Sequence, residues 1–120
     1  MKRNSSYRYP KTVREMVEGQ RHYILNQEKL PSVTTILSAT QSAEKRESLA
    51  AWRLRVGEDS AARIMEESAA RGTAMHKILE KYVLEEGYLD QTNVGKQAHN
   101  MAIQVIQSGL SNMTEYYGTE

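Results

Sequence analysis

The sequence predicts a mainly helical α+β protein, in which an N-terminal β-hairpin precedes about four helices and the last residues begin a core strand. Three observations support this prediction. Apolar residues recur at i, i+3, i+4 spacing through most of residues 31–108, as in amphipathic helices. Serines, acids and glycines stand where such helices would start and stop. Residues 13–30 instead carry a strand-turn-strand pattern around Gly19.

The first twelve residues are expected to form a flexible basic arm. Five cations precede the first acid of the chain, and two tyrosines lie among them: Lys2, Arg3, Tyr7, Arg8, Tyr9, Lys11 and Arg14. Cations attract phosphates and aromatic rings stack on bases, so this composition suits a nucleic-acid-binding arm. A disordered, solvated terminus has the same composition, and both interpretations stay open.

Turn and capping residues delimit the elements that follow. The predicted hairpin over residues 13–30 turns at Glu18-Gly19, because glycine tolerates a positive φ. Pro31 interrupts the hairpin, and Ser32 is suited to cap a helix within residues 31–39. A second helix is predicted over residues 43–56, ending at Gly57.

The second half of the chain predicts two further helices. One starts at Glu58, runs to about Ala70, pauses near Gly72 and resumes to Glu86. The other spans residues 93–108 and stops before Gly109. A nascent strand at Tyr116-Tyr117 has no evident partner apart from the hairpin.

Composition bounds the function classes. The chain has 120 residues, enough for one small domain, and has no cysteine, which excludes disulfides and thiolate chemistry. No apolar run reaches the roughly 18–20 residues of a membrane span, and no secretory signal is visible. We therefore expect a soluble, cytoplasmic protein with no membrane partner.

His76 is the main candidate for chemistry. It stands at the edge of an apolar helical stripe, with Gly72 and Thr73 about one turn before it. An imidazole facing a cleft is a good ligand for a divalent metal, and small residues beside it would admit a phosphate. The alternative is a satisfied residue at the core boundary. The scattered His22 and His99 complete no known metal-binding motif.

Arg46 and Arg53 are seven residues apart and share one face of the helix predicted over residues 43–56. With Trp52 they could bind a DNA backbone or stack on a base. The alternative places Trp52 in the core and leaves the arginines solvated.

Three stretches together resemble a known family. They are Leu30-Pro31-Ser32-Val33-Thr34-Thr35-Ile36-Leu37, Trp52-Arg53-Leu54-Arg55-Val56-Gly57 and Arg71-Gly72-Thr73-Ala74-Met75-His76. Their order and spacing are similar to the N-terminal part of phage exonucleases of the RecB-like PD-(D/E)XK superfamily, which includes the mitochondrial genome maintenance exonuclease. The resemblance covers about residues 20–120.

The resemblance implies a metal-dependent exonuclease acting on DNA, with single-stranded DNA expected. It implies that His76 helps to ligate Mg²⁺ or Mn²⁺, with Gly72 keeping the approach to it clear. Residues implied to contact DNA are Arg46, Arg53, Arg71 and Thr73.

The chain departs from the family at the catalytic core, which needs an Asp and then an (Asp/Glu)-x-Lys pair. None of the 15 acids here has a lysine two positions later. Glu120 matches an acid that some relatives place on the first core strand, and would be a metal ligand. We therefore expect residues 13–120 to be the helical segment of such a nuclease without its catalytic sheet, inactive alone.

Three explanations of that departure stay open: a missing continuation, a split enzyme whose catalytic core is a separate polypeptide, or a short protein that binds DNA or regulates a nuclease. A purely structural helical protein with chance matches is a further alternative. An exposed strand edge near Tyr116 and uncovered apolar helix faces also lead us to expect a homo-oligomer.

Overall fold

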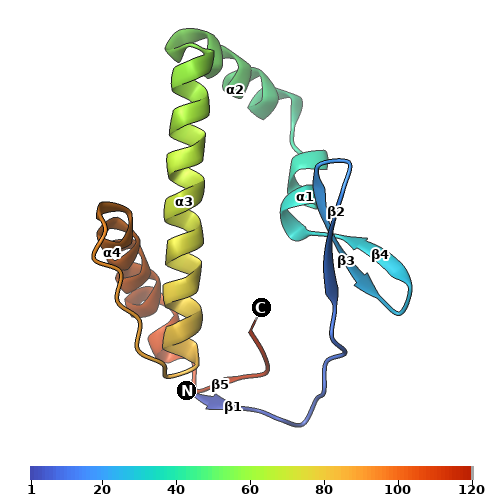
Figure 1. The fold of residues 1–120 in the computed structure, drawn as a ribbon, viewed down its shortest axis with the longest axis vertical. Coiled ribbons are helices and arrows are strands. Elements are labelled where there is room, and N and C mark those ends of the chain that lie inside the picture. The colour runs from blue at the N-terminus through green and yellow to red at the C-terminus, as the bar shows by residue number, and fades with distance from the viewer. Residues whose placement is uncertain (120) are drawn as a thin grey trace. The chain divides into compact units, whose positions relative to one another are not determined.

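The computed structural model describes residues 1–119, which form four α-helices, a short 3-10 helix and five strands in two small sheets (Figure 1). The predicted fold class, mainly α with an N-terminal hairpin, is confirmed. The chain divides into two compact units. Residues 1–7 and 58–119 form the helical unit, and residues 8–57 form the sheet unit.

The sheet unit begins with three antiparallel strands in the order β2 (Val13–Val17), β3 (Gln20–Leu25) and β4 (Glu28–Pro31). Two-residue turns join them. Glu18 and Gly19 have φ of 52° and 76°, and Asn26 and Gln27 have φ of 49° and 69°. Positive φ at both central residues is the conformation that best matches the twist of a hairpin.

The predicted turn at Glu18-Gly19 is therefore confirmed, but the prediction missed the second turn and the third strand. Asn26 tolerates positive φ well, whereas Gln27 rarely adopts it. The pair Asn26-Gln27 is therefore a weak turn signal, and residues 13–30 were predicted to form a single hairpin.

Two capped helices complete this unit. Ser32 accepts a hydrogen bond from the backbone N–H of Thr35 at 3.1 Å and caps α1 (Val33–Ala39), as predicted. Ser42 caps α2 (Ala43–Val56) in the same way. The predicted helix over residues 43–56 is confirmed, and it ends at Gly57, whose φ is 87°.

The helical unit is built on α3 (Glu58–Val83), which runs without a break through Gly72. The predicted pause is wrong, because one glycine costs a helix only about 1 kcal/mol and the neighbouring alanines favour helix. The helix also ends earlier than the predicted Glu86. Glu85 has a φ of 57°, which a continuing right-handed helix does not allow.

The core lies where α4 (Asn93–Ser108) packs on the C-terminal half of α3 (Figure 1). Ile78, Ala98 and Ala102 are buried, and Ala74, Met75, Leu79 and Tyr88 pack around them. The alanines on α4 allow the two helices to approach closely. After α4, the chain makes a short 3-10 turn, η1 (Leu110–Asn112).

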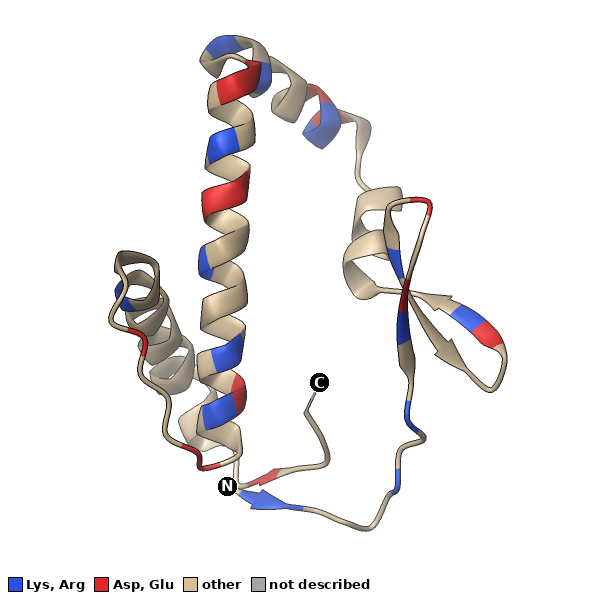
Figure 2. Ribbon diagram, viewed as in Figure 1, with Lys and Arg blue, Asp and Glu red and all other residues tan. Residues whose placement is uncertain are grey.

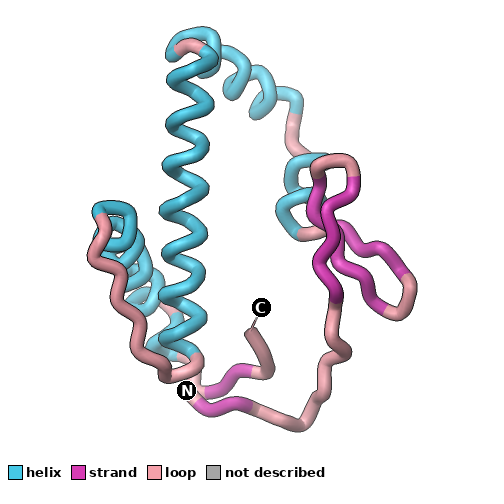
Figure 3. Tube along the Cα trace, in the orientation of Figure 1, coloured by secondary structure: helices cyan, strands magenta, loops and turns pink. Residues whose placement is uncertain are grey.

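A second sheet joins the two ends of the described chain. Here β1 (Lys2–Arg3) pairs in parallel with β5 (Glu115–Tyr116), as the strand colouring of Figure 3 shows. The predicted C-terminal strand exists, but its partner is β1 and not the hairpin. Parallel pairing between segments so distant in sequence leaves no local signal. Part of the segment expected to be a flexible arm therefore lies in a strand.

Several apolar side chains remain exposed. Val33 and Leu37 on the predicted apolar face of α1 are 72% and 63% exposed, and Leu54 on α2 is 86% exposed. Among residues 1–119, none of the helices combines the length and the apolar character that crossing a membrane requires. The expectation of a homo-oligomer, which rests on such uncovered faces, stays a prediction.

Candidate functional site

His76 lies on α3 and is exposed. Gly72 and His76 are four residues apart, so they lie on one face of the helix, and the exposed Thr73 is next to them. A Cβ atom added at Gly72 would meet no other atom within 4 Å. Packing among residues 1–119 therefore does not require the glycine, and the space beside it, one turn before His76, is open.

The described residues do not complete a metal centre around His76. Within residues 1–119, no three His, Cys, Asp or Glu side chains gather closely enough to hold a metal ion. Glu80 is one turn further along α3 and is half-buried. The other predicted ligand, Glu120, lies outside the described residues. His76 thus offers one imidazole donor, and a full ligand set needs carboxylates from elsewhere.

The predicted DNA contacts fall in both units. In the helical unit, Arg71 and Thr73 are on α3. The Arg71 guanidinium donates to Gln97 Oε1 on α4 at 3.3 Å and to Ser68 Oγ at 3.3 Å. Arg71 therefore links α3 to α4. The same guanidinium group would have to keep these bonds while it contacts DNA, or exchange them for that contact. Thr73 is exposed.

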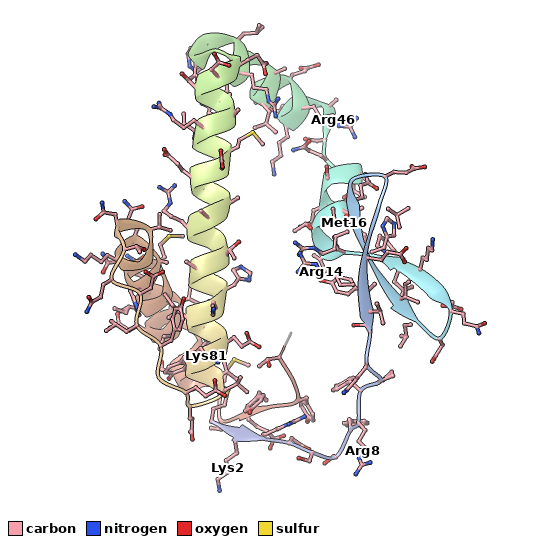
Figure 4. The ribbon with its side chains drawn as sticks, in the orientation of Figure 1. Lys2, Arg8, Arg14, Met16, Arg46 and Lys81 are labelled. Carbon is pink, nitrogen blue, oxygen red and sulfur yellow. The ribbon has the colours of Figure 1, made fainter. Side chains whose placement is uncertain are left out.

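Arg46 and Arg53 lie on α2 in the sheet unit, and both are exposed. Figure 2 shows the charged residues of α2, and Figure 4 labels Arg46. Arg46 Nη2 reaches the carbonyl oxygen of Ala39 at 3.5 Å, across the turn between α1 and α2. Trp52, on the same helix, is half-buried. The structure brings Arg46 and Arg53 onto one helix but leaves α2 without a buried residue.

Sequence reasoning missed a polar cluster at the start of α4. Asp90 Oδ1 accepts hydrogen bonds from the Thr92 hydroxyl at 2.6 Å and the Thr92 backbone N–H at 3.0 Å. Thr92 Oγ1 in turn accepts from the Gly95 N–H at 3.0 Å and caps α4. The hydrogen bonds from Thr92 lower the pKa of Asp90, and the nearby His99 and Lys77 lower it further. The signal that could have revealed this cap was Thr92 itself, a preferred N-cap residue directly before the helix predicted over residues 93–108.

Other charged contacts in this region are also structural. The Lys77 ammonium lies over the Tyr88 ring, 5.1 Å from its centroid. Lys81 donates a short hydrogen bond to Glu86, which raises the pKa of Lys81. His99 Nε2 is shielded from solvent and has no hydrogen-bond partner among the described residues. The contacts of Lys77 and Lys81 stabilise the end of α3 and the loop before α4.

No protein-family model matches this chain, and comparisons with curated proteins and with solved structures give no match. The resemblance to RecB-like nucleases therefore stays a prediction that depends on the three stretches in α1, α2 and α3.

Proposed function

We propose that this chain is the N-terminal helical part of a metal-dependent DNA exonuclease, which hydrolyses phosphodiester bonds in single-stranded DNA. The chain alone is inactive in this proposal, because the Asp and (Asp/Glu)-x-Lys residues of such enzymes are missing from it. A phage origin follows from the same resemblance. The proposed place of action is the cytoplasm, in the host cell if a phage encodes the chain.

The observation that supports this proposal best is the surface formed by Gly72, Thr73 and His76. A glycine inside a 26-residue helix lowers helix stability, and no packing contact among the described residues explains it. A ligand that must approach the helix closely does explain it. The exposed imidazole one turn later is positioned to meet the same ligand, a metal ion bound to a phosphate.

The remaining metal ligands are proposed to come from outside the described residues. Mg²⁺ and Mn²⁺ prefer carboxylate oxygens, and His76 supplies only one nitrogen. Glu120 is one proposed carboxylate, and a separate catalytic-core polypeptide is the proposed source of the others. Arg46, Arg53, Arg71 and Thr73 are the proposed DNA contacts.

The test combines the purified chain with a polypeptide, encoded beside it, that carries the Asp and (Asp/Glu)-x-Lys motifs. We expect Mg²⁺-dependent degradation of a labelled single strand by the mixture only, and loss of that activity with His76→Ala. His22→Ala, in the sheet unit, is the matched control. Unchanged activity of the His76→Ala mixture would refute the ligand role.

Gly72→Ala gives an independent readout. The added methyl group meets open space, so we expect it to stabilise the fold by about 0.5–1 kcal/mol. If the glycine serves ligand approach, the same variant lowers nuclease activity of the mixture despite its greater stability. A more stable variant with full activity would remove the main support for the proposal.

A second candidate is a non-catalytic DNA-binding or regulatory module derived from such a nuclease. The exposed Arg46 and Arg53 on α2 favour it, since phosphate binding by arginine needs no metal. This candidate predicts that the chain binds single-stranded DNA in the presence of EDTA, with affinity falling steeply as salt rises. Absence of binding at low salt would count against it.

A further inference from the structure

A polar pocket lies between the sheet and α1, entirely within the sheet unit. It is lined by Met16 from β2, Gln20 and Arg21 from β3, and the hydroxyl residues Thr34, Thr35 and Ser38 from α1. Figure 4 labels Met16 on β2, at one wall of this pocket. The volume is about 290 Å³, just below the range of about 300–1,000 Å³ for small-molecule sites. The size suits one small polar group.

The orientation of α1 makes this pocket polar. Thr35 Oγ1 donates to the Arg21 carbonyl oxygen at 3.4 Å, and the Ser32 backbone N–H donates to the same oxygen at 3.2 Å. These bonds hold α1 on the sheet through Ser32 and Thr35, and the apolar Val33 and Leu37 remain exposed. A helix that packs on a sheet for core stability has the opposite orientation. The hydroxyl groups that line the pocket therefore favour a polar ligand, which can form hydrogen bonds with them.

One hydroxyl of the pocket remains available. Ser32 Oγ lies 3.1 Å from Thr34 Oγ1 and 2.9 Å from Thr35 Oγ1, so both threonines already have partners. Among the described residues, Ser38 Oγ has no hydrogen-bond partner. Because a hydroxyl can donate one hydrogen bond, Ser38 can bind an acceptor in the pocket.

Arg21 supplies the charge of the pocket, and none of the residues that line it is acidic. Arg21 Nε is shielded from solvent and lacks a hydrogen-bond partner in the described part of the chain. Because solvent does not reach Nε, a ligand in the pocket would bond to the terminal Nη atoms of Arg21, and such a planar pair of donors best matches an oxyanion that accepts two parallel hydrogen bonds. Phosphate has the charge, size and acceptor geometry for this position.

We propose that this pocket binds a phosphate group of the single-stranded DNA backbone, held by the Arg21 guanidinium and the Ser38 hydroxyl. The DNA source rests on the proposed function, whereas the phosphate chemistry rests on the pocket alone. A backbone phosphate carries no base identity, so the contact positions the strand without selecting its sequence.

The first experiment tests the pocket without DNA. Inorganic phosphate is titrated into the full chain, and NMR follows the Arg21 Nε–H and the backbone amides of Gln20 and Ser38. We expect weak, saturable shifts at these positions that Arg21→Gln abolishes. Arg21→Lys keeps the charge but not the paired donors, so we expect it to restore only part of the shifts.

The second experiment measures binding of a labelled single strand by fluorescence anisotropy. Losing a charge-assisted hydrogen bond weakens binding roughly tenfold or more, which is the effect expected for Arg21→Gln. Lys29→Gln, which removes one exposed charge from β4 in the same unit, is the control and shows only the general loss of charge. Ser38→Ala is the second variant, since alanine favours helix and the folded chain loses no hydrogen bond.

The outcomes separate the two proposals. Phosphate shifts in the pocket, together with an Arg21→Gln effect on DNA larger than that of Lys29→Gln, support the inference. Absence of phosphate shifts, or equal effects of Arg21→Gln and Lys29→Gln with Ser38→Ala unchanged, overturns it and leaves the proposed function standing. Phosphate binding without any DNA binding overturns both the DNA source and the proposed DNA-binding role, and supports a site for a free phosphate.

Discussion

Different interactions stabilise the helical unit and the sheet unit, each within itself. In the helical unit, α3 and α4 bury Ile78, Ala98 and Ala102 against each other. In the sheet unit, Ser32 is the one described residue that is buried, and it acts through hydrogen bonds to Arg21 and Thr35. The helical unit therefore depends on the volume of its side chains, whereas the sheet unit depends on backbone conformation and polar contacts. We therefore expect the helical unit to be sensitive to changes of side-chain volume, and the sheet unit to changes at its turns and polar contacts.

The largest expected effect is removal of the core side chain in the helical unit. Ile78 is 7% exposed, and Ile78→Ala leaves a cavity between α3 and α4, so we expect a loss of about 2–5 kcal/mol in the free energy of unfolding. Leu54→Ala, at a position 86% exposed in the sheet unit, is the control and should change it by less than about 0.5 kcal/mol. Urea denaturation measures both. Equal losses of unfolding free energy in Ile78→Ala and Leu54→Ala would show that side-chain volume does not distinguish the two units.

Two helix glycines sharpen the comparison inside the helical unit. A Cβ atom at Gly95 would collide with the carboxylate and the carbonyl oxygen of Asp90, so Gly95→Ala should destabilise by about 1–3 kcal/mol. Gly72→Ala, where the space is open, should instead stabilise by about 0.5–1 kcal/mol. Thermal denaturation of both variants measures the contrast. Two shifts of the same sign would mean that close packing around Gly95 does not matter.

Turn substitutions test the sheet unit. Gln27 adopts a φ of 69°, which costs a residue with a side chain about 1 kcal/mol, so Gln27→Gly should stabilise by up to about that amount. Gly19→Ala places a side chain at a φ of 76° and should destabilise by about the same amount. Chemical denaturation monitored by sheet amide signals provides the measurement. Insensitivity to both changes would show that the turns do not control this unit.

The smallest expected effect is a pH dependence of the helical unit. Hydrogen bonds from Thr92 hold the pKa of Asp90 below its ordinary value of 3.8. The charged carboxylate therefore stabilises the fold above that pH, and the stabilisation is lost as the pH falls through the lower folded pKa. Urea midpoints measured from about pH 6 down to about pH 2 should fall at the acid end. Asp90→Asn still accepts from Thr92 and should flatten this fall, and an unchanged profile would exclude Asp90 as its cause.

Most element boundaries were predictable because they depend on local interactions. Ser32 caps α1, Gly57 ends α2 and Gly109 follows α4, as their side chains or conformational freedom suggested. The errors arose where local signals were weak. Gln27 concealed a turn, and Gly72 suggested a break that a helix of 26 residues tolerates.

The candidate site was only partly predictable. The sequence placed Gly72, Thr73 and His76 on one helical face, and the structure shows that Thr73 and His76 are exposed. It could not show that Arg71 bonds to Gln97 on α4, or that Arg21 lines a pocket with α1. Those contacts join residues at least 13 positions apart, and periodicity carries no information at that range.

The sequence by itself determined the helices, the Ser32 cap of α1 and the first turn, because hydrogen bonds and backbone preferences within a few residues decide them. Tertiary structure alone decided the parallel pairing of β1 with β5, the close contact of α3 with α4 at Ala98 and Ala102, and the hydrogen bond from Thr35 on α1 to Arg21 on the sheet. The reason is physical. Each of these depends on surfaces that meet only after the chain has folded, so the free energy that selects them belongs to no local segment.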